Sequence, residues 1–182
     1  DIDGVIFTPA NTSYFSTSYK WKPPEENTID FLVRMESNRK GILYVGIRTS
    51  IFNQMHLKLP HNYHKLFPNI RRKNNLFPVE FKPPTRSDKY ENIHEIYEQK
   101  DGIKLEDDAI FECRYDNNLG YFIAKRKRDD KTEEYRKYMR TFGNFWQVAV
   151  DTWQSILEPI TAEMLSGKES IPEKYFLTED TG

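Results

Sequence analysis

The sequence has 182 residues, of which 37% are hydrophobic and 30% are charged, and its formal net charge is -1. This length allows one ordinary domain and part of another. No apolar stretch approaches the roughly 18 residues that a membrane-spanning helix needs, and the first ten residues lack the basic start and cleavage site of a signal peptide. Composition therefore argues against a membrane or secreted protein, and the total charge does not by itself indicate nucleic acid as a partner.

The first part of the chain predicts short strands separated by turns. Apolar and alternating patterns predict strands over residues 1–7, 18–22, 27–33 and 41–47. Polar residues 36–40 are predicted to be the turn of a hairpin between the last two of these strands. Because the first strand begins without a lead-in, we expect the sequence to be a piece of a longer protein.

The middle of the chain predicts a long loop and then further strands. We expect residues 53–75 to be rich in loops. His56, His61 and His64 are expected to be exposed there rather than bound to a metal, since neither cysteine nor carboxylate lies near them in sequence. Three more strands are expected at residues 77–82, 109–115 and 120–125. A short helix carrying His94 is expected at residues 92–99. About five short strands suffice for a small closed barrel such as the oligonucleotide-binding (OB) fold.

The end of the chain changes from strand to helix patterns. After Gly143, apolar residues recur at the three- and four-residue spacing of an amphipathic helix, which Pro159 ends; they are Trp146, Val150, Trp153 and Leu157. A second short helix is predicted over residues 161–165. The expected fold class is therefore mainly β with some α. The single cysteine, Cys113, lies in an apolar run and is expected in the core of a protein from a reducing compartment.

Two pairs of charged residues near the start share strand faces. Lys20 and Lys22 point to the same side of the predicted strand, and such a pair is tolerated on a half-buried strand if an anion such as phosphate lies between them. Asp1 and Asp3 also share a face, and Gly4 lets a ligand approach closely, which would suit Mg²⁺ or Mn²⁺. For the lysine pair, a solvent-facing strand with two solvated lysines is the alternative.

A basic run follows the last predicted strand. Between residues 125 and 140, eight basic side chains are interleaved with four acidic ones. Within it, the forked guanidinium groups of Arg126 and Arg128 suit the β- and γ-phosphates of a nucleotide, and a nearby aspartate such as Asp130 can orient them. A solvated charged surface is the commoner reading of such runs.

The order of these motifs resembles the covalent nucleotidyltransferase family, and specifically its mRNA-capping branch. The resemblance extends from Asp1 to about Lys131 and rests on Asp3-Gly4-Val5-Ile6-Phe7, Lys20-Trp21-Lys22-Pro23, Asn27-Thr28-Ile29-Asp30-Phe31, Ile110-Phe111-Glu112-Cys113 and Arg128-Asp129-Asp130-Lys131. It implies the final strands of an ATP-grasp-like nucleotidyltransferase domain over residues 1–26 and an OB-fold barrel over residues 27–142. Residues 143–182 are then expected to be a helical linker toward a cap methyltransferase domain, as in the large capping enzymes of cytoplasmic DNA viruses.

The resemblance also implies a role for each matching residue. Asp3 matches the metal-binding acidic residue, for Mg²⁺ or Mn²⁺, and Lys20 and Lys22 match the contacts to the α-phosphate. Asp30 matches a nucleotide-site aspartate of the family. The expected contacts to the β- and γ-phosphates come from a separate group, which comprises Arg126, Arg128, Asp130 and Lys131. Of all these residues, Asp3, Lys20, Lys22, Arg128 and Lys131 are expected to act in catalysis.

The activity that the resemblance implies is transfer of GMP from GTP, through a lysyl-GMP intermediate, to the 5′-diphosphate end of RNA. RNA triphosphatase and cap methyltransferase domains are expected to flank the chain, and the expected location is the host cytoplasm or the virion. The family's nucleophile is the lysine of a Lys-x-Asp-Gly motif, which this sequence lacks, because Gln99-Lys100-Asp101-Gly102 has glutamine at that position. We therefore expect this chain alone to be inactive.

Two other functions fit parts of the pattern. An ATP-dependent nucleic-acid ligase shares the same folds and order of motifs. A non-catalytic OB module that binds single-stranded RNA or a partner subunit would also lack the nucleophile. The second alternative leaves the joint presence of Asp3, Lys20 and Lys22 unexplained.

Overall fold

A computed structural model describes residues 4–7, 19–70, 75–83, 90 and 92–172. The chain divides into two compact units. One unit combines the two ends of the sequence, 1–27 and 154–182, and the other is the continuous stretch Thr28–Trp153. Each unit is described by itself below.

The unit made of the two chain ends contains a short antiparallel pair of strands. In it, β1 (Val5–Phe7) pairs with β2 (Tyr19–Trp21), and the 3₁₀ helix η1 (Pro24–Glu26) follows. The two sequence ends are joined by a hydrogen bond of 2.7 Å that the indole Nε1 of Trp21 donates to the carbonyl oxygen of Ile160. The short helix α5 (Ala162–Leu165) comes next, as predicted for this region.

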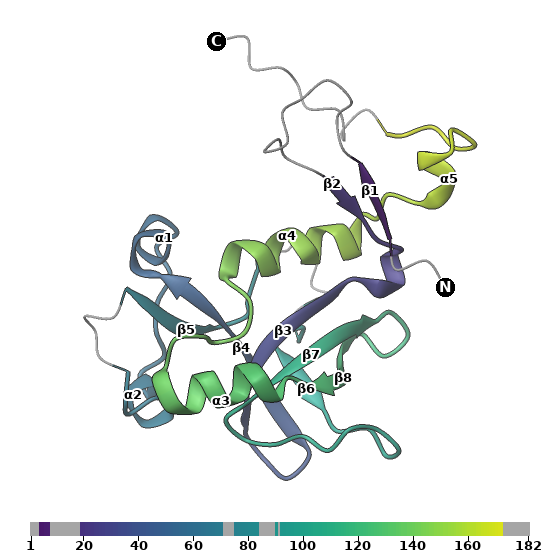
Figure 1. The fold of residues 1–182 in the computed structure, drawn as a ribbon. Helices are drawn as coiled ribbons and strands as arrows, with labels where there is room; N and C mark the ends of the chain where they lie inside the picture. The colour runs from purple at the N-terminus through teal and green to yellow at the C-terminus, as the bar shows by residue number, and fades with distance from the viewer. Residues whose placement is uncertain (1–3, 8–18, 71–74, 84–89, 91, 173–182) are drawn as a thin grey trace. The chain divides into compact units, whose positions relative to one another are not determined.

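The continuous unit is built around a closed five-stranded barrel (Figure 1). Its strands, in the order in which they neighbour one another, are β3 (Thr28–Met35), β7 (Ala109–Asp116), β8 (Tyr121–Lys127), β6 (Glu95–Tyr97) and β4 (Lys40–Arg48), which returns to β3. The pairs are antiparallel except β6 with β8. An additional strand, β5 (Leu76–Glu80), extends the sheet beyond β4. The predicted fold class, the hairpin over β3 and β4, and the barrel are confirmed.

Aromatic side chains fill the barrel. Phe31 lies with its ring centroid 4.9 Å from that of Phe81 and 5.0 Å from that of Phe122, and all three are fully buried. Burying each such ring contributes roughly 1.5–3 kcal/mol to stability. Cys113 is fully buried on β7, as predicted, and burial raises the pKa of its thiol.

In the described part of this unit, four helices accompany the strands, and the last of them continues beyond Trp153 (Figure 1). They are α1 (Thr49–Gln54), α2 (Tyr63–Leu66), α3 (Asp129–Tyr138) and α4 (Trp146–Leu157). The amphipathic helix predicted after Gly143 is confirmed by α4, which buries Trp146, Ala149 and Trp153. Among the described residues, no helix is long and apolar enough to cross a lipid bilayer.

One sequence prediction was wrong in this unit. The helix predicted over residues 92–99 is replaced by β6, whose Ile96 pairs with both Gly41 of β4 and Phe122 of β8. These pairings close the barrel and bury Ile96 completely, so tertiary packing overrides the local pattern. Residues 53–75 are loop-rich where they are described, as predicted, and include the short helix α2.

Helix α3 was also not predicted. Acidic Asp129 and Asp130 occupy its first turn and basic Arg136 and Lys137 its last turn, which complements the helix dipole. The helix ends at Met139, whose φ of 53° lies in the left-handed region. The basic run therefore leaves strand β8 and continues into a helix.

Candidate functional site

Asp30 is the buried carboxylate around which the candidate site is arranged. Side chains alternate along β3, so Phe31 points into the barrel and Asp30 to the opposite face. Asp30 is only 6% exposed, and a buried carboxylate is unfavourable unless it is paired and hydrogen-bonded. Its partners are therefore expected to be held firmly.

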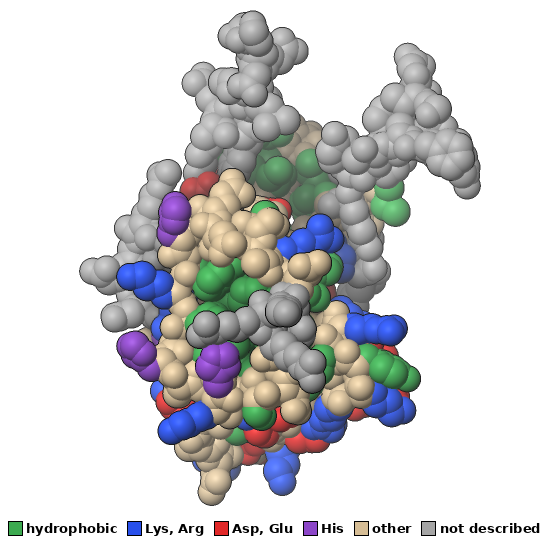
Figure 2. Space-filling view, turned by 90° about the vertical axis from the view of Figure 1, so that its left-hand side faces the viewer, with side chains coloured by type: hydrophobic (Ala, Val, Ile, Leu, Met, Phe, Trp, Pro, Cys, Tyr) green, Lys and Arg blue, Asp and Glu red, His purple; other side chains and the backbone are tan. Residues whose placement is uncertain are grey.

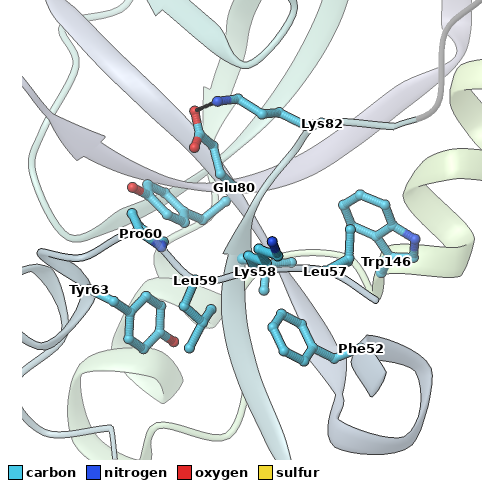
Figure 3. Close-up of a pocket in the computed structure, with 11 residues that line it drawn as sticks. Phe52, Leu57, Lys58, Leu59, Pro60, Tyr63, Glu80, Lys82 and Trp146 are labelled. Atoms are coloured by element: carbon cyan, nitrogen blue, oxygen red, sulfur yellow. Dashed lines mark ion pairs between the residues drawn. The ribbon is translucent and has the colours of Figure 1, made fainter. Parts of the chain in front are cut away.

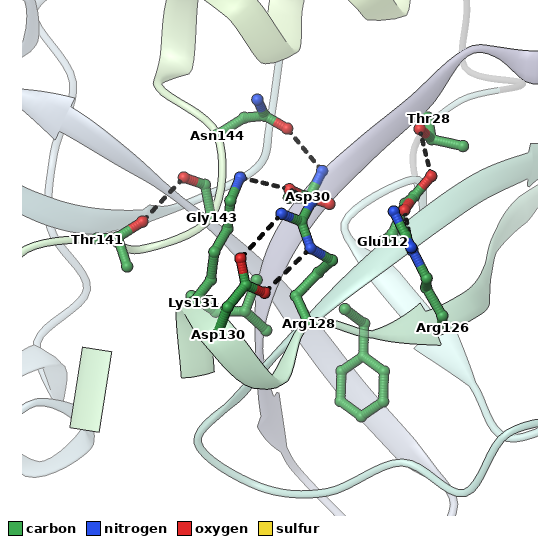
Figure 4. A network of polar contacts seen from close by, with 12 residues as sticks. Thr28, Asp30, Glu112, Arg126, Arg128, Asp130, Lys131, Thr141, Gly143 and Asn144 are labelled. Atoms are coloured by element: carbon green, nitrogen blue, oxygen red, sulfur yellow. Dashed lines mark hydrogen bonds and ion pairs between the residues drawn. The ribbon is translucent and has the colours of Figure 1, made fainter. Parts of the chain in front are cut away.

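Two cations from the start of α3 bind one oxygen of Asp30. Arg128 Nη1 and Lys131 Nζ donate to Asp30 Oδ2 at 2.7 and 2.6 Å (Figure 4). Both cations remain partly accessible, with side-chain exposures of 23% for Arg128 and 29% for Lys131. The arrangement therefore presents two anchored positive charges at the surface.

Asp130 occupies the other side of the Arg128 guanidinium. Its carboxylate accepts from Arg128 Nε at 3.3 Å and from Nη2 at 3.2 Å, while its own side chain is 68% exposed. These bonds hold the pKa of Asp130 below its usual range and raise that of Arg128. The formal charges of Asp30, Arg128, Asp130 and Lys131 cancel in this conformation.

Main-chain bonds to β7 hold the turn from β8 into α3 in place. The Arg128 main-chain N–H donates to the carbonyl of Ile110 at 2.8 Å. The hydroxyl of Thr132, which is 3% exposed, accepts from the Ile110 N–H at 2.9 Å. Residues three apart on a helix lie on neighbouring positions of its surface, so Arg128 and Lys131 reach the same carboxylate.

Arg126 belongs to a separate ion pair. It donates from Nε to Glu112 Oε2 at 2.5 Å, and the hydroxyl of Thr28 donates to the other oxygen of Glu112 at 3.0 Å (Figure 4). Burial raises the pKa of Glu112, but the bonds from Arg126 and Thr28 outweigh it and leave that pKa below its ordinary value. The structure thus joins Asp30, Arg128, Asp130 and Lys131 and sets Arg126 apart from them.

Three other basic residues of the run are also paired with carboxylates. Lys127 and Arg136 both bind Glu106, and Lys137 binds Glu133. The run therefore shows much less uncompensated positive charge than its sequence suggests.

The remaining predicted site residues belong to the unit made of the chain ends. Lys20 lies on β2, and the half-buried Lys22 follows the end of that strand. Asp3, the predicted metal ligand, lies outside the described residues. Within the part of the chain that is described, no group of three or more histidine, cysteine, aspartate or glutamate residues could hold a metal ion.

Sequence reasoning missed Asn144 as a member of the site. Its side-chain Oδ1 accepts from the Asp30 main-chain N–H at 2.6 Å, and its own N–H donates to the Asp30 carbonyl at 2.7 Å (Figure 4). The sequence Gly143-Asn144 looks like an ordinary turn before a helix, and nothing local in it points to Asp30.

A pocket of about 330 Å³ lies elsewhere in the same unit (Figure 3). Its lining is mainly apolar and aromatic, including Phe52, Tyr63 and Trp146, with the ion pair of Glu80 and Lys82 beside it. His56, His61 and His64 are exposed, as predicted. On the face of the molecule shown in Figure 2, the histidine side chains, in purple, lie apart rather than in a cluster. The pocket is separate from Asp30 and its cations.

Comparison with known proteins finds long matches to capping enzymes, although no family model matches the chain. The mRNA-capping enzyme of African swine fever virus (isolate Tick/South Africa/Pretoriuskop Pr4/1996) is 33% identical over 202 residues, covering 100% of this chain and 22% of that protein. The probable mRNA-capping enzyme of Acanthamoeba polyphaga mimivirus is 28% identical over 188 residues, covering 91% of this chain and 16% of that protein. The mRNA-capping enzyme of Mus musculus is 25% identical over 200 residues, covering 100% of this chain and 25% of that protein. The chain thus spans about a fifth of the length of the curated relatives it matches.

Proposed function

The chain is homologous to a segment of viral-type mRNA-capping enzymes, and on this premise we propose that it serves mRNA capping as part of an mRNA guanylyltransferase. The proposed reaction has two steps. A lysine Nζ attacks the α-phosphorus of GTP, the bond from that phosphorus to the bridging oxygen breaks, and pyrophosphate leaves. The terminal oxygen of a 5′-diphosphate RNA then attacks the same phosphorus and releases the lysine.

The observation that carries the proposal is the sharing of Asp30 by Arg128 and Lys131. Asp30 fixes one side of the Arg128 fork at 2.7 Å, so that Nε and Nη2 are directed elsewhere. Those two atoms are bound by the exposed carboxylate of Asp130, which can be replaced by phosphate oxygens at small cost because it is solvated. Arginine is well suited to such bidentate contacts with phosphate.

Preorganised charge is effective in this kind of reaction. Negative charge accumulates on the leaving pyrophosphate, and cations already held in place stabilise it without reorganising at the moment of reaction. We assign Arg128 and Lys131 to the β- and γ-phosphates, with Asp30 orienting the fork and Asp130 holding its other side until phosphate binds. Arg126, paired with Glu112, is assigned a contact at the edge of the same site.

The unit made of the chain ends is assigned the α-phosphate. Lys20 and Lys22 would bind that phosphate in both steps, because the α-phosphorus is the centre attacked each time. Asp3 would hold Mg²⁺ or Mn²⁺, which offsets negative charge on phosphate oxygens when bound. The nucleophilic lysine would come from a part of the enzyme outside this sequence, so the 182-residue chain alone should not be labelled by GTP.

The test separates the two steps in the full-length enzyme that contains this sequence. Arg128→Ala should slow formation of lysyl-GMP by about 10²-fold or more, the effect expected when a preorganised charge contact is removed from a transition state. Transfer of GMP from the preformed intermediate to 5′-diphosphate RNA should change much less, because pyrophosphate has already left. Arg136→Ala is the matched control, since it removes an arginine of α3 that binds Glu106 instead of Asp30.

Two outcomes would contradict the proposal. Equal losses in both steps for Arg128→Ala would show that this residue is not specific for the leaving pyrophosphate. Labelling of the full-length enzyme by ATP in preference to GTP would instead favour a nucleic-acid ligase.

A further inference from the structure

Residues 143–145 complete the sheet beside Asp30. Strand β3 pairs with β4 from Leu32 to Met35, and beyond Leu32 the segment 143–145 lies beside both strands. Gly143 forms an antiparallel bridge with Phe31, and Phe145 forms a parallel bridge with Gly46 of β4. The segment thus bridges two barrel strands where they diverge.

Asn144 satisfies both main-chain polar groups of Asp30. The Asp30 N–H donates to Asn144 Oδ1 at 2.6 Å, and the Asp30 carbonyl accepts from the Asn144 N–H at 2.7 Å. The Asn144 carbonyl accepts from the N–H of Gly46 at 2.9 Å, which ties the same residue to β4. Part of this pairing depends on a side chain, so it is sensitive to the identity of residue 144.

Gly143 permits this close approach for two separate reasons. Its φ of +85° lies in the left-handed region that side chains disfavour. A Cβ at this position would lie 2.3 Å from the Asp30 carbonyl oxygen, which is far inside van der Waals contact. Any side chain here would therefore push the main chain of Asp30 away.

We propose that Gly143 and Asn144 form a positioning clamp for the phosphate site, acting through Asp30. The carboxylate of Asp30 is joined to the main chain by a short side chain, so a shift of that main chain moves the oxygen that holds Arg128 and Lys131. Their bonds of 2.7 and 2.6 Å leave little room for such a shift. A misplacement of about 1 Å at a reacting centre can cost about 10²-fold in rate. The clamp rests on the proposed function and adds Gly143 and Asn144 to the residues that this function requires.

The first measurement concerns structure alone and uses the 182-residue chain. The Arg128 Nε–H signal in a ¹⁵N–¹H NMR spectrum reports the guanidinium position, and it is identified by its disappearance in Arg128→Lys. Asn144→Ala should shift or broaden this signal. Asn144→Asp retains an oxygen acceptor at the same place and should largely preserve it. Tyr63→Phe is the matched control, because it removes a different side-chain bond to the main chain, which the Tyr63 hydroxyl donates to the Pro78 carbonyl at 2.9 Å.

The second measurement uses the two half-reactions of the full-length enzyme. Asn144→Ala should slow formation of lysyl-GMP by about 10-fold, corresponding to about 1.4 kcal/mol, while transfer to RNA changes little. Asn144→Asp should restore most of the rate, and Tyr63→Phe should leave both steps near normal. A purely structural role for Asn144 would reduce both steps together.

The two measurements distinguish failure of the clamp from failure of the proposed function. An unchanged Arg128 signal in Asn144→Ala, or equal losses in both half-reactions, would overturn the clamp. If the signal moves as expected but Arg128→Ala leaves lysyl-GMP formation intact, the clamp exists and the assignment of Arg128 to pyrophosphate is wrong.

Discussion

Replacing Asp30 by asparagine should destabilise the unit Thr28–Trp153 more than any other charge removal in the site. The change keeps the shape of the side chain but leaves Arg128 and Lys131 without the anion that each contacts within 2.7 Å. Breaking a fully buried ion pair by removing one partner costs about 3–5 kcal/mol. Arg128 and Lys131 are 23% and 29% exposed and can recover some hydration, so we expect about 2–3 kcal/mol for Asp30→Asn.

The assay is urea unfolding of the 182-residue chain followed by tryptophan fluorescence. Trp146 and Trp153 are buried at 2% and 1% exposure, so their emission should change when the unit unfolds. The expected loss corresponds to a fall in melting temperature of about 5–10 °C for a protein of this size. Asp130→Asn is the matched control, because its carboxylate is 68% exposed and should contribute little to stability.

A double-mutant cycle gives the decisive comparison. Combining Asp30→Asn with Lys131→Met should cost less than the sum of the two single changes by about 1–2 kcal/mol, because the second change removes one of the stranded cations. Additive effects, or a loss for Asp30→Asn no greater than for Asp130→Asn, would refute the view that Asp30 holds the two cations.

Two further predictions concern a glycine and a carboxylate. Gly143→Ala should lower the free energy of unfolding, measured by circular dichroism melting, by about 3 kcal/mol or more. Gly120→Ala is the control: Gly120 has a φ of +77° but nothing within 4 Å of the added Cβ, so this change should cost only about 1 kcal/mol. Similar losses for the two variants would show that the contact with Asp30 is unimportant. Because the pKa of Glu112 is lowered by folding, its contribution to stability is present above its ordinary pKa of 4.5 and lost as pH falls through its lower folded value. Glu112→Gln should therefore flatten the fall in urea midpoint below about pH 4.5, and an unchanged acid profile would refute that coupling to Arg126.

The long strands of the barrel were predictable from sequence because their patterns are local. β3, β4, β7 and β8 each carry seven to nine residues with apolar or alternating character, and all were predicted within a few residues of their observed bounds. β6 has only three residues, and its place depends on two strands that lie far away in sequence. A pattern of that length cannot distinguish a strand from a helix.

The residues of the candidate site were predictable through the resemblance, but their arrangement was not. Asp30, Arg128 and Lys131 were selected from motifs, whereas nothing local indicates that both cations bind one oxygen of a residue 98 and 101 positions away. Asn144 was missed because its role depends on the divergence of β3 from β4, which appears only after the barrel closes. The roles of all the predicted site residues in nucleotide binding and catalysis stay predictions, and Asp3 lies outside the described residues.

The spacing of contacts around Asp30 has a consequence for the order of synthesis. Asp30 is near the start of its unit, yet its cations come about a hundred positions later and its main-chain partner Asn144 comes 114 positions later. A nascent chain can therefore form the hairpin of β3 and β4 soon after both strands leave the ribosome, because their contacts are local. The Asp30 cluster can be completed only after Asn144 has emerged. Although the Asp30 carboxylate is translated early, it therefore acquires its partners only as the unit nears completion.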